Sequence, residues 1–247
     1  MLIAIEGVDK SGKETQAALL LERLRSENRN VRKIEFPNYA SEASAAVKMY
    51  LNGEFGESPD DVNPYAASIL FTVDRYASYK KDWSAFLGSG GIVIADRYTM
   101  SNMIHQGAKF ADPAERRAYI GWLADFEFVK VGLPRPDIVI FLDLSMELRL
   151  MLMEKKMRAD GVDYRFADGV DHRFADGLER RFADSRGNRF ADIHERDLGY
   201  LNRSHLCARE VAAALGWTRV EAGNGGALRS AADIHEELYA AVAPLLP

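Results

Sequence analysis

A glycine-rich turn between an apolar run and an amphipathic stretch constrains this chain most. The turn, GVDKSGKET at residues 7–15, directly follows the apolar run of residues 2–6. Apolar residues after it have the i, i+3, i+4, i+7 spacing of one helix face: Ala17, Leu20, Leu21 and Leu24. A strand, a glycine turn and a helix start form a phosphate cradle, because glycines let backbone N–H groups point inward and the helix N-terminus adds positive potential. The string fits G-x-x-x-x-G-K, so it predicts a nucleotide-binding loop in which Lys13 reaches the β- and γ-phosphates.

The residues predicted to contact the nucleotide phosphates are Gly7, Ser11, Gly12, Lys13, Glu14 and Thr15. The position after Lys13 normally carries a Ser or Thr hydroxyl for Mg²⁺, and here it holds Glu14. The neighbouring Thr15 offers a hydroxyl instead, and Mg²⁺ readily keeps several waters, so we expect binding to survive. The sequence has no N-K-x-D or T-K-x-D string, which argues against a guanine-specific GTPase and leaves ATPases and nucleotide kinases.

Strand-like runs alternate with helical stretches along the chain. Short β-branched runs lie at residues 2–6, 31–36, 91–96 and 137–144, with a weaker one at 217–221. Two of them, IVIA and IVIFL, are almost continuously apolar, as strands buried on both faces should be. We therefore predict an α/β fold, a five-stranded parallel sheet flanked by helices, in a single domain over residues 1–247.

Composition excludes several classes of partner. The 32 Lys and Arg against 37 Asp and Glu give a net charge of −5, so no overall basic field predicts nucleic-acid binding. No apolar run approaches the ~20 residues of a membrane span, and the first apolar run is too short for a secretory signal. The single cysteine, Cys207, fits a reducing compartment and is interpreted as a small residue packed on a helix. We expect a cytoplasmic protein without a membrane segment.

Residues 161–192 form four consecutive octapeptides, GVDYRFAD, GVDHRFAD, GLERRFAD and SRGNRFAD. Eight residues advance an ideal helix by about 800°, so the repeated Phe side chains cannot form one helical stripe. The recurring glycines interrupt a strand as well. We interpret the segment as an expanded surface loop with no function of its own, inserted in the domain at about residues 156–192.

Six ordered strings resemble the thymidylate kinase (dTMP kinase) family. They are IEGVDKSGK at 5–13, FPNY at 36–39, LFTVDR at 70–75, ADRYTMSNMIHQ at 95–106, GLPRPDIVIFLDL at 132–144 and DIHERD at 192–197. The resemblance implies a P-loop kinase sandwich with a flexible lid that carries the octapeptide repeats. It further implies transfer of a phosphoryl group from ATP to dTMP with Mg²⁺, and a homodimer.

The resemblance also implies which residues bind the acceptor dTMP: Asp9, Phe36, Pro37, Phe71, Arg75, Arg97, Ser101, Asn102, His105 and Gln106. Asp9 would hold the 3′-hydroxyl, and Arg97 would grip the phosphate with its planar fork. Phe71 would stack on the base, with Arg75 one helical turn later on the same face. Family members often have Tyr near His105, which leaves the exclusion of a ribose 2′-hydroxyl open.

By the same resemblance the catalytic residues are Lys13, Lys10, Arg97 and Asp9, and the Mg²⁺ ligands are Asp96 and Glu195. The family places the cation that covers the transferring phosphoryl group in the P-loop or on the lid. We favour Lys10 with a lid arginine assisting, and the arginine stays open among Arg158, Arg165, Arg173, Arg180, Arg181, Arg186 and Arg189. Two alternatives remain: a kinase for another nucleoside monophosphate, such as dUMP or CMP, and a non-catalytic nucleotide-binding module.

Overall fold

The computed structural model describes residues 1–159, 192–224 and 226–247. Its main sheet has the parallel strand order β2-β3-β1-β4-β5. These strands are β1 (Leu2–Gly7), β2 (Val31–Glu35), β3 (Ile92–Asp96), β4 (Ile138–Asp143) and β5 (Thr218–Glu221). The predicted five-stranded parallel sheet is confirmed, and each expected run matches its strand to within one residue at either end. A small antiparallel pair, β6 (Gly223–Asn224) and β7 (Ala227–Leu228), was not predicted.

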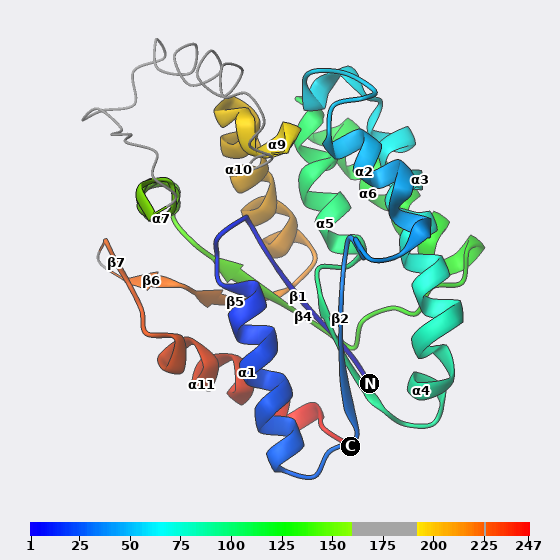
Figure 1. Cartoon of the computed structure of the whole chain (residues 1–247), viewed down its shortest axis with the longest axis vertical. Coiled ribbons are helices and arrows are strands. Elements are labelled where there is room, and N and C mark those ends of the chain that lie inside the picture. Colours follow the sequence, from blue (N-terminus) through cyan, green and yellow to red (C-terminus); the bar gives the residue numbers. More distant parts are fainter. Residues whose placement is uncertain (160–191, 225) are drawn as a thin grey trace.

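Helices lie on both sides of the sheet (Figure 1). They are α1 (Lys13–Ser26), α2 (Ala45–Leu51), α3 (Pro64–Ser78), α4 (Ser84–Gly88), α5 (Thr99–His105), α6 (Pro113–Asp125), α7 (Met146–Ala159), α9 (Ile193–Arg196), α10 (Leu198–Ala214) and α11 (Ala231–Val242). Short 3₁₀ turns lie at η1 (Glu42–Ser44), η2 (Pro59–Asp61), η4 (Gly107–Lys109) and η7 (Ala243–Leu245). Two π-helical segments, η3 (Tyr79–Trp83) and η5 (Phe126–Lys130), continue α3 and α6.

The sheet separates two hydrophobic cores. On one face, Ile3 and Ile5 of β1 pack with Leu20 of α1 and Leu238 of α11. On the other face, the alternating Leu2 and Ala4 belong to a cluster with residues of α5, α6 and α10. Cys207 of α10 is buried in this second cluster, as its packing interpretation expected. Burial on both faces explains why the central strands are so apolar.

The two edge strands differ from the central ones in composition. In β2 three of five residues are charged, and in β5 Arg219 and Glu221 are exposed. Charged side chains on an edge strand disfavour pairing with a further strand from another chain. The sequence of each strand therefore matches its place in the sheet.

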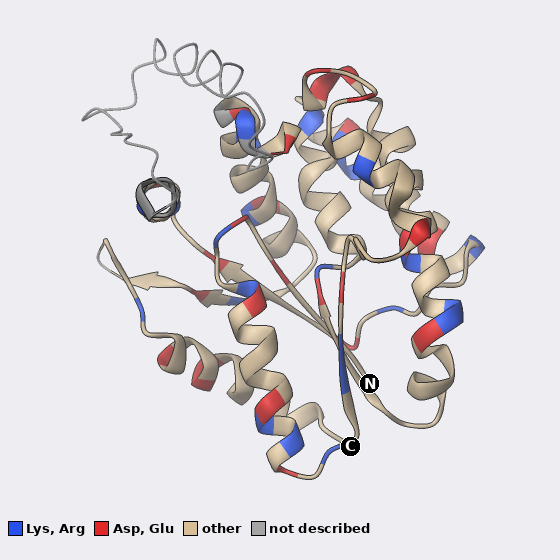
Figure 2. Cartoon of the chain, in the orientation of Figure 1, with Lys and Arg blue, Asp and Glu red and all other residues tan. Residues whose placement is uncertain are grey.

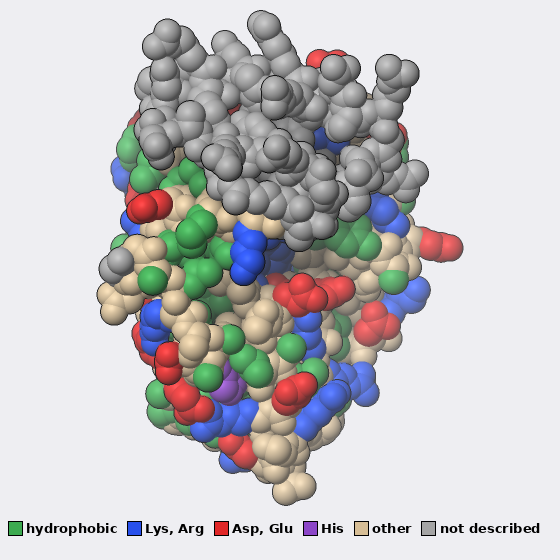
Figure 3. Space-filling view, turned by 60° about the vertical axis from the view of Figure 1, so that its left-hand side comes forward, with side chains coloured by type: hydrophobic (Ala, Val, Ile, Leu, Met, Phe, Trp, Pro, Cys, Tyr) green, Lys and Arg blue, Asp and Glu red, His purple; other side chains and the backbone are tan. Residues whose placement is uncertain are grey.

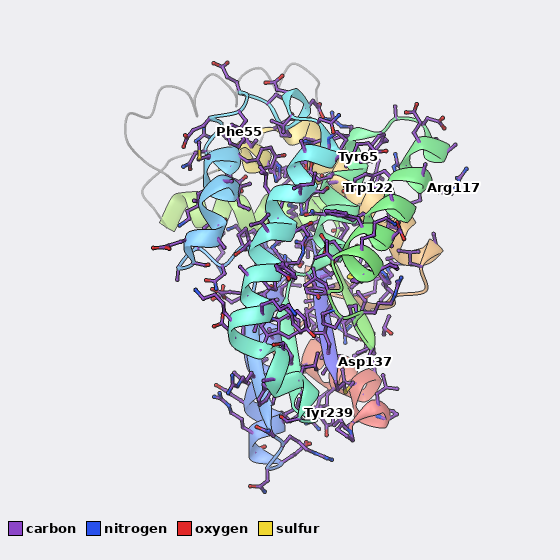
Figure 4. All side chains as sticks on the ribbon, turned by 90° about the vertical axis from the view of Figure 1, so that its right-hand side faces the viewer. Phe55, Tyr65, Arg117, Trp122, Asp137 and Tyr239 are labelled. Atoms are coloured by element: carbon purple, nitrogen blue, oxygen red, sulfur yellow. The ribbon has the colours of Figure 1, made fainter. Side chains whose placement is uncertain are left out.

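Aromatic side chains fix α3 against α6. Tyr65 of α3 and Trp122 of α6 lie together in Figure 4, with ring centroids 4.7 Å apart at 74°. Tyr119 of α6 contacts the same Tyr65 ring in a second edge-on pair. These contacts pack the start of α3 against the second half of α6.

All parallel strands send the chain out at one edge of the sheet. The P-loop follows β1, Phe36 and Pro37 follow β2, Arg97 follows β3, and α7 follows β4. Ligands of open α/β sheets bind at this carboxyl edge. The fold alone therefore brings the chemically interesting segments together.

Positively and negatively charged residues are mixed over the parts of the molecule that the figures show. Acidic and basic positions are interspersed along the ribbon (Figure 2), and both are mixed with hydrophobic side chains on the face in Figure 3. None of the helices within the described ranges has the length and apolar character needed to cross a bilayer. The octapeptide repeats at residues 161–192 lie, apart from Asp192, outside the described ranges, so the predictions made for them concern residues that the structure does not describe.

Gly7 ends β1 where a side chain has no room. Its φ is +155°, and a Cβ there would lie 2.6 Å from Ser11 Oγ and 2.7 Å from the Leu142 carbonyl oxygen. We expect Gly7→Ala to lower the free energy of unfolding by about 1–3 kcal/mol, measured by urea denaturation. Gly88→Ala is the matched control, because a Cβ there meets nothing within 4 Å. A control that loses as much stability as Gly7→Ala would contradict this steric explanation.

Candidate active site

The loop after β1 leaves the N-terminus of α1 open to a ligand. Gly12 has a left-handed φ of 91° at the N-cap, and no side chain caps this helix end. Backbone N–H groups in the first turn of a helix have no intrahelical partner and favour an anion. The Ser11 hydroxyl is buried in the same loop, and no hydrogen-bond partner for it lies among the described residues. The predicted phosphate cradle therefore has the expected backbone form.

Lys13 begins α1 and points back into the loop. Its Nζ donates to the Val8 carbonyl at 2.8 Å, and the residue is only 6% exposed. Burial, together with the nearby Arg97 guanidinium, lowers the pKa of Lys13 to about 7. Phosphate oxygens placed here would favour the charged form, so ligand binding and protonation of Lys13 support each other.

Two arginines from distant segments meet at the Asp9 carboxylate. Arg97 Nη2 contacts Asp9 Oδ1, and Arg149 Nη2 of α7 donates to Asp9 Oδ2 at 3.3 Å. Burial by itself would raise the pKa of Asp9, but the positive charges of Arg97, Lys13 and Arg149 outweigh it and hold the pKa well below the usual range. Asp9 is therefore ionised and joins the P-loop to the segments after β3 and β4.

A buried glutamate in β1 fixes the segment that carries Arg97. Glu6 accepts hydrogen bonds from the Tyr98 N–H (2.7 Å), the Ser101 N–H (3.1 Å) and the Ser101 hydroxyl (2.7 Å). Burial raises the pKa of Glu6, and the bond from Ser101 opposes that shift. Arg97 itself has a left-handed φ of 67°, a conformation that a non-glycine residue keeps only where its surroundings enforce it.

A cavity of about 310 Å³ lies next to this charged centre. Its lining residues are Asp9, Phe36, Pro37, Tyr39, Leu51, Phe71, Arg75, Arg97, Tyr98, Ser101, Asn102, His105, Gln106, Asp192 and His194. All ten residues predicted to bind the acceptor are in that set. The structure thus brings together predicted residues from four separate segments, although their individual roles stay predictions.

Arg75 lines the cavity, and its guanidinium forms a fully buried ion pair. Its Nε donates to Glu127 Oε2 at 3.0 Å and its Nη2 contacts Glu127 Oε1, and the two side chains are 1% and 0% exposed. The hydroxyls of Thr72 (2.7 Å) and Thr99 (2.5 Å) donate to the same carboxylate. Glu127 lies in η5, a π-helical segment of the kind that often occurs at functional sites. It holds the Arg75 guanidinium in one orientation.

Two neutral imidazoles form another part of the cavity wall. The rings of His105 and His194 stack with centroids 5.6 Å apart at 8°. Burial lowers the pKa of His105 well below its usual value and that of His194 to about 3. His194 Nε2 lies 2.8 Å from the Tyr50 hydroxyl, to which Lys109 Nζ donates at 3.2 Å. The side chains of this wall can therefore form hydrogen bonds with a ligand without adding charge to the cavity.

Asp96 is placed where a single carboxylate could hold a divalent cation. It ends β3 beside Arg97, its side chain is 12% exposed, and Lys33 Nζ lies 4.0 Å from its Oδ2. Burial raises the pKa of Asp96. Within residues 1–159, 192–224 and 226–247 no cluster of three or more potential ligands occurs. Mg²⁺ commonly takes one or two carboxylates together with substrate phosphates and waters, so Asp96 fits that ion.

The other predicted residues fall in several places. Lys10, with a left-handed φ of 67°, and the first-turn residues Glu14 and Thr15 are exposed on the P-loop and α1. Glu195 belongs to α9, but its side chain lies outside the described residues. The candidate lid arginine Arg158 belongs to α7, but its side chain is likewise outside the described residues, and the other six candidate lid arginines lie outside the described ranges altogether.

The sequence analysis missed the cavity-lining residues Tyr39, Leu51, Tyr98, Asp192 and His194. It also missed four residues that contact the lining from behind or beside it: Glu6, Tyr50, Glu127 and Arg149. Glu6 had a usable signal, because a charged residue inside an apolar strand needs a partner when buried. Tyr50, Glu127 and Arg149 lie in ordinary helical patterns, and only the tertiary packing reveals their partners.

The Arg75–Glu127 pair permits a direct test of stability. Glu127→Gln keeps the side-chain shape but leaves the Arg75 cation buried without a carboxylate. We expect a loss of about 3–5 kcal/mol in the free energy of unfolding, measured by urea denaturation. Glu22→Gln, at an exposed position of α1, should stay within about 0.5 kcal/mol of the parent protein. Equal losses in both variants would show that the Arg75–Glu127 ion pair contributes no more to the free energy of unfolding than an exposed carboxylate does.

Comparisons of this chain with known proteins agree on one family. Residues 5–168, more than half of the chain, match the family model described as thymidylate kinase. Thymidylate kinase from Mycobacterium tuberculosis is 36% identical over 149 residues, which cover 60% of this chain and 68% of that protein. The human thymidylate kinase is 30% identical over 145 residues, covering 59% and 61%.

Solved structures show the same fold. A thymidylate kinase from Candida albicans superposes with a TM-score of 0.63 at 21% sequence identity, covering 99% of this chain and 91% of that one. One from Ehrlichia chaffeensis gives a TM-score of 0.60 at 18% identity, covering 98% of each chain. With a family model matched over more than half of its length, this chain belongs to the thymidylate kinase family.

Proposed function

We propose that this protein transfers the γ-phosphoryl group of ATP to the 5′-phosphate of dTMP, giving ADP and dTDP. The observation that carries this function is the cavity of about 310 Å³ beside an open P-loop. Its volume lies at the lower end of the range for small-molecule sites, which suits a nucleoside monophosphate. Its lining combines the charged Asp9 and Arg97 with Asn102, Phe71 and Arg75.

The donor side is built by the P-loop. In this proposal the N–H groups at the start of α1 bind the phosphates of ATP, together with Lys13 and the Ser11 hydroxyl. Lys13 is held against the loop by the Val8 carbonyl and needs only a local shift to reach a phosphate oxygen. The exposed Lys10 on the same loop stays our candidate for covering the transferring group, with a lid arginine assisting.

The acceptor side is built by the cavity. Arg97 would bind the phosphate of dTMP, and Asp9 the 3′-hydroxyl. Phe71 would stack on the pyrimidine, while Arg75, fixed by Glu127, donates to an oxygen at the base edge. The base-edge role of Ser101 and Asn102, the pocket-wall role of Phe36 and Pro37, and the sugar or base contacts of His105 and Gln106 belong to the same proposal.

The transfer itself requires positioning and charge neutralisation more than proton chemistry. A phosphate oxygen of dTMP forms a bond to the γ-phosphorus as the bond to the bridging oxygen breaks, and that electron pair leaves with ADP. Asp96 would hold Mg²⁺, with Glu195 as the second proposed ligand. When bound, the ion neutralises charge on the donor phosphates.

A coupled assay of ADP release tests the function. We expect the highest kcat/KM with dTMP, and a value about 10- to 200-fold lower with dUMP, because one missing methyl group is worth only about 1–3 kcal/mol. Turnover of CMP at the rate of dTMP would replace this function with a broader monophosphate kinase. ATP binding without turnover of any monophosphate would indicate a non-catalytic module instead.

A homodimer is also part of the proposal, and an exposed apolar patch supports it. Ile69, Val73 and Tyr76 on one side of α3 are 43%, 52% and 41% exposed, and Val129 in η5 is 64% exposed. Ile69, Val73 and Tyr76 border a groove completed by Phe126 and Val131. Contiguous apolar surface of this kind marks an interaction site. We also propose a cytoplasmic location for the protein.

Light scattering after size-exclusion chromatography tests the dimer. We expect the parent protein to have the mass of two chains and Val73→Asp that of one, because a charge in the centre of the patch disfavours its burial. Leu215→Asp, at a similarly exposed position at the end of α10, is the control and should leave the mass unchanged. A monomeric parent protein would end this part of the proposal.

A further inference from the structure

Arg149 is a buried cation near the phosphate-binding loop. It lies in the first turn of α7, directly after β4 ends at the carboxyl edge of the sheet, and its side chain is 1% exposed. An arginine cannot lose its proton in a protein, so its burial carries a large desolvation penalty. A residue kept charged in such a place needs a partner or a function.

The partners of Arg149 point toward the phosphate site. Its Nη2 donates to Asp9 Oδ2 at 3.3 Å, and its Nη1 donates to the Leu201 carbonyl at 3.5 Å. Asp9 belongs to the P-loop and lines the acceptor cavity, and its side chain is 22% exposed. The Arg149 guanidinium therefore contacts a residue that lines the acceptor cavity.

Asp9 shares one carboxylate between two arginines. Arg97 contacts Oδ1 and Arg149 contacts Oδ2, so the two guanidinium groups converge on neighbouring oxygens. A guanidinium binds phosphate oxygens with the same planar fork that it uses for carboxylate oxygens. Two arginines that converge on one carboxylate are thus arranged to converge on a phosphoryl group beside it.

We propose that Arg149 is a further catalytic residue, which binds the oxygens of the phosphoryl group during its transfer together with Arg97. The inference rests on the proposed kinase function. As the bond from the acceptor oxygen to the γ-phosphorus forms and the bond to ADP breaks, negative charge spreads over the equatorial oxygens. Arg149 stabilises that charge and exchanges no proton.

Arg149 differs from the other candidates for this cation. Lys10 is exposed, whereas Arg149 is held by the P-loop carboxylate and by a backbone carbonyl of α10. A charge that is already oriented and desolvated stabilises a transition state without reorganisation at the moment of reaction. Arg149 also precedes the segment to which the candidate lid arginines belong.

Steady-state kinetics and calorimetry of Arg149→Ala and Arg149→Lys test the inference. We expect kcat to fall about 10²- to 10³-fold in Arg149→Ala and less in Arg149→Lys, which keeps the charge but not the fork. The dissociation constants of ATP and dTMP should stay within about threefold of the parent values, because the contact strengthens only in the transition state. Added guanidinium ion at millimolar concentration should restore part of the kcat of Arg149→Ala.

Arg209→Lys is the matched control. Arg209 of α10 pairs with the buried Asp143 at the end of β4, so it is a second arginine–aspartate pair near this edge that does not line the cavity. This variant should keep kcat within about threefold of the parent.

Three outcomes would count against Arg149 as a catalytic residue: unchanged kcat in both of its variants, a loss confined to melting temperature, or a kcat that guanidinium does not restore. A parent protein that releases no ADP with dTMP would instead end the proposed function, so the two failures are distinguishable. If Arg149→Ala does not fold, Arg149→Lys still decides, because an intact parent-like kcat there overturns the role of the planar fork.

Discussion

The site depends on one buried carboxylate in the central strand. Glu6 of β1 accepts two backbone N–H groups and one hydroxyl from the segment after β3, and so fixes the turn in which Arg97 has its left-handed conformation. Without that acceptor, three donors would lose this partner, each at a cost of about 1–3 kcal/mol where it stays buried and unpaired. Because Arg97 in turn contacts Asp9, Glu6 couples the strand that leads into the P-loop to the wall of the acceptor cavity.

Buried charges are concentrated along this edge, and each has a specific partner. Glu127 is paired with Arg75, and Asp143 with Arg209 and Arg219. Such pairs seldom add net stability over a hydrophobic core, since desolvation offsets much of the Coulomb attraction. Their value lies in orientation, because a guanidinium held by two or three hydrogen bonds keeps its geometry when a ligand arrives. The low-charge part of the cavity, with its stacked His105 and His194 rings, complements this arrangement.

Much of this architecture could be predicted from the sequence. The central strands β1, β3 and β4 were predictable because burial on both faces demands nearly continuous apolar runs. The P-loop was predictable because Gly7 and Gly12 occupy positions that restrict side chains. The set of acceptor residues came from resemblance to a family, and all of its members line one cavity. Hairpin β6–β7 and the π-helical segments gave no such signal, because very short or irregular elements lack a periodic pattern.

By itself the sequence determined the sheet, its phosphate-binding loop and the family, because local periodicity and glycine placement depend on neighbouring residues. Only the tertiary structure decided which charges meet. Arg149 and Asp9 are separated by 140 positions, and Arg75 and Glu127 by 52, in segments whose local patterns are those of ordinary helices and turns. Pairing over such separations follows from how β1, β3 and β4 align at one sheet edge and how α3 packs on α6, and no short stretch of sequence encodes that geometry.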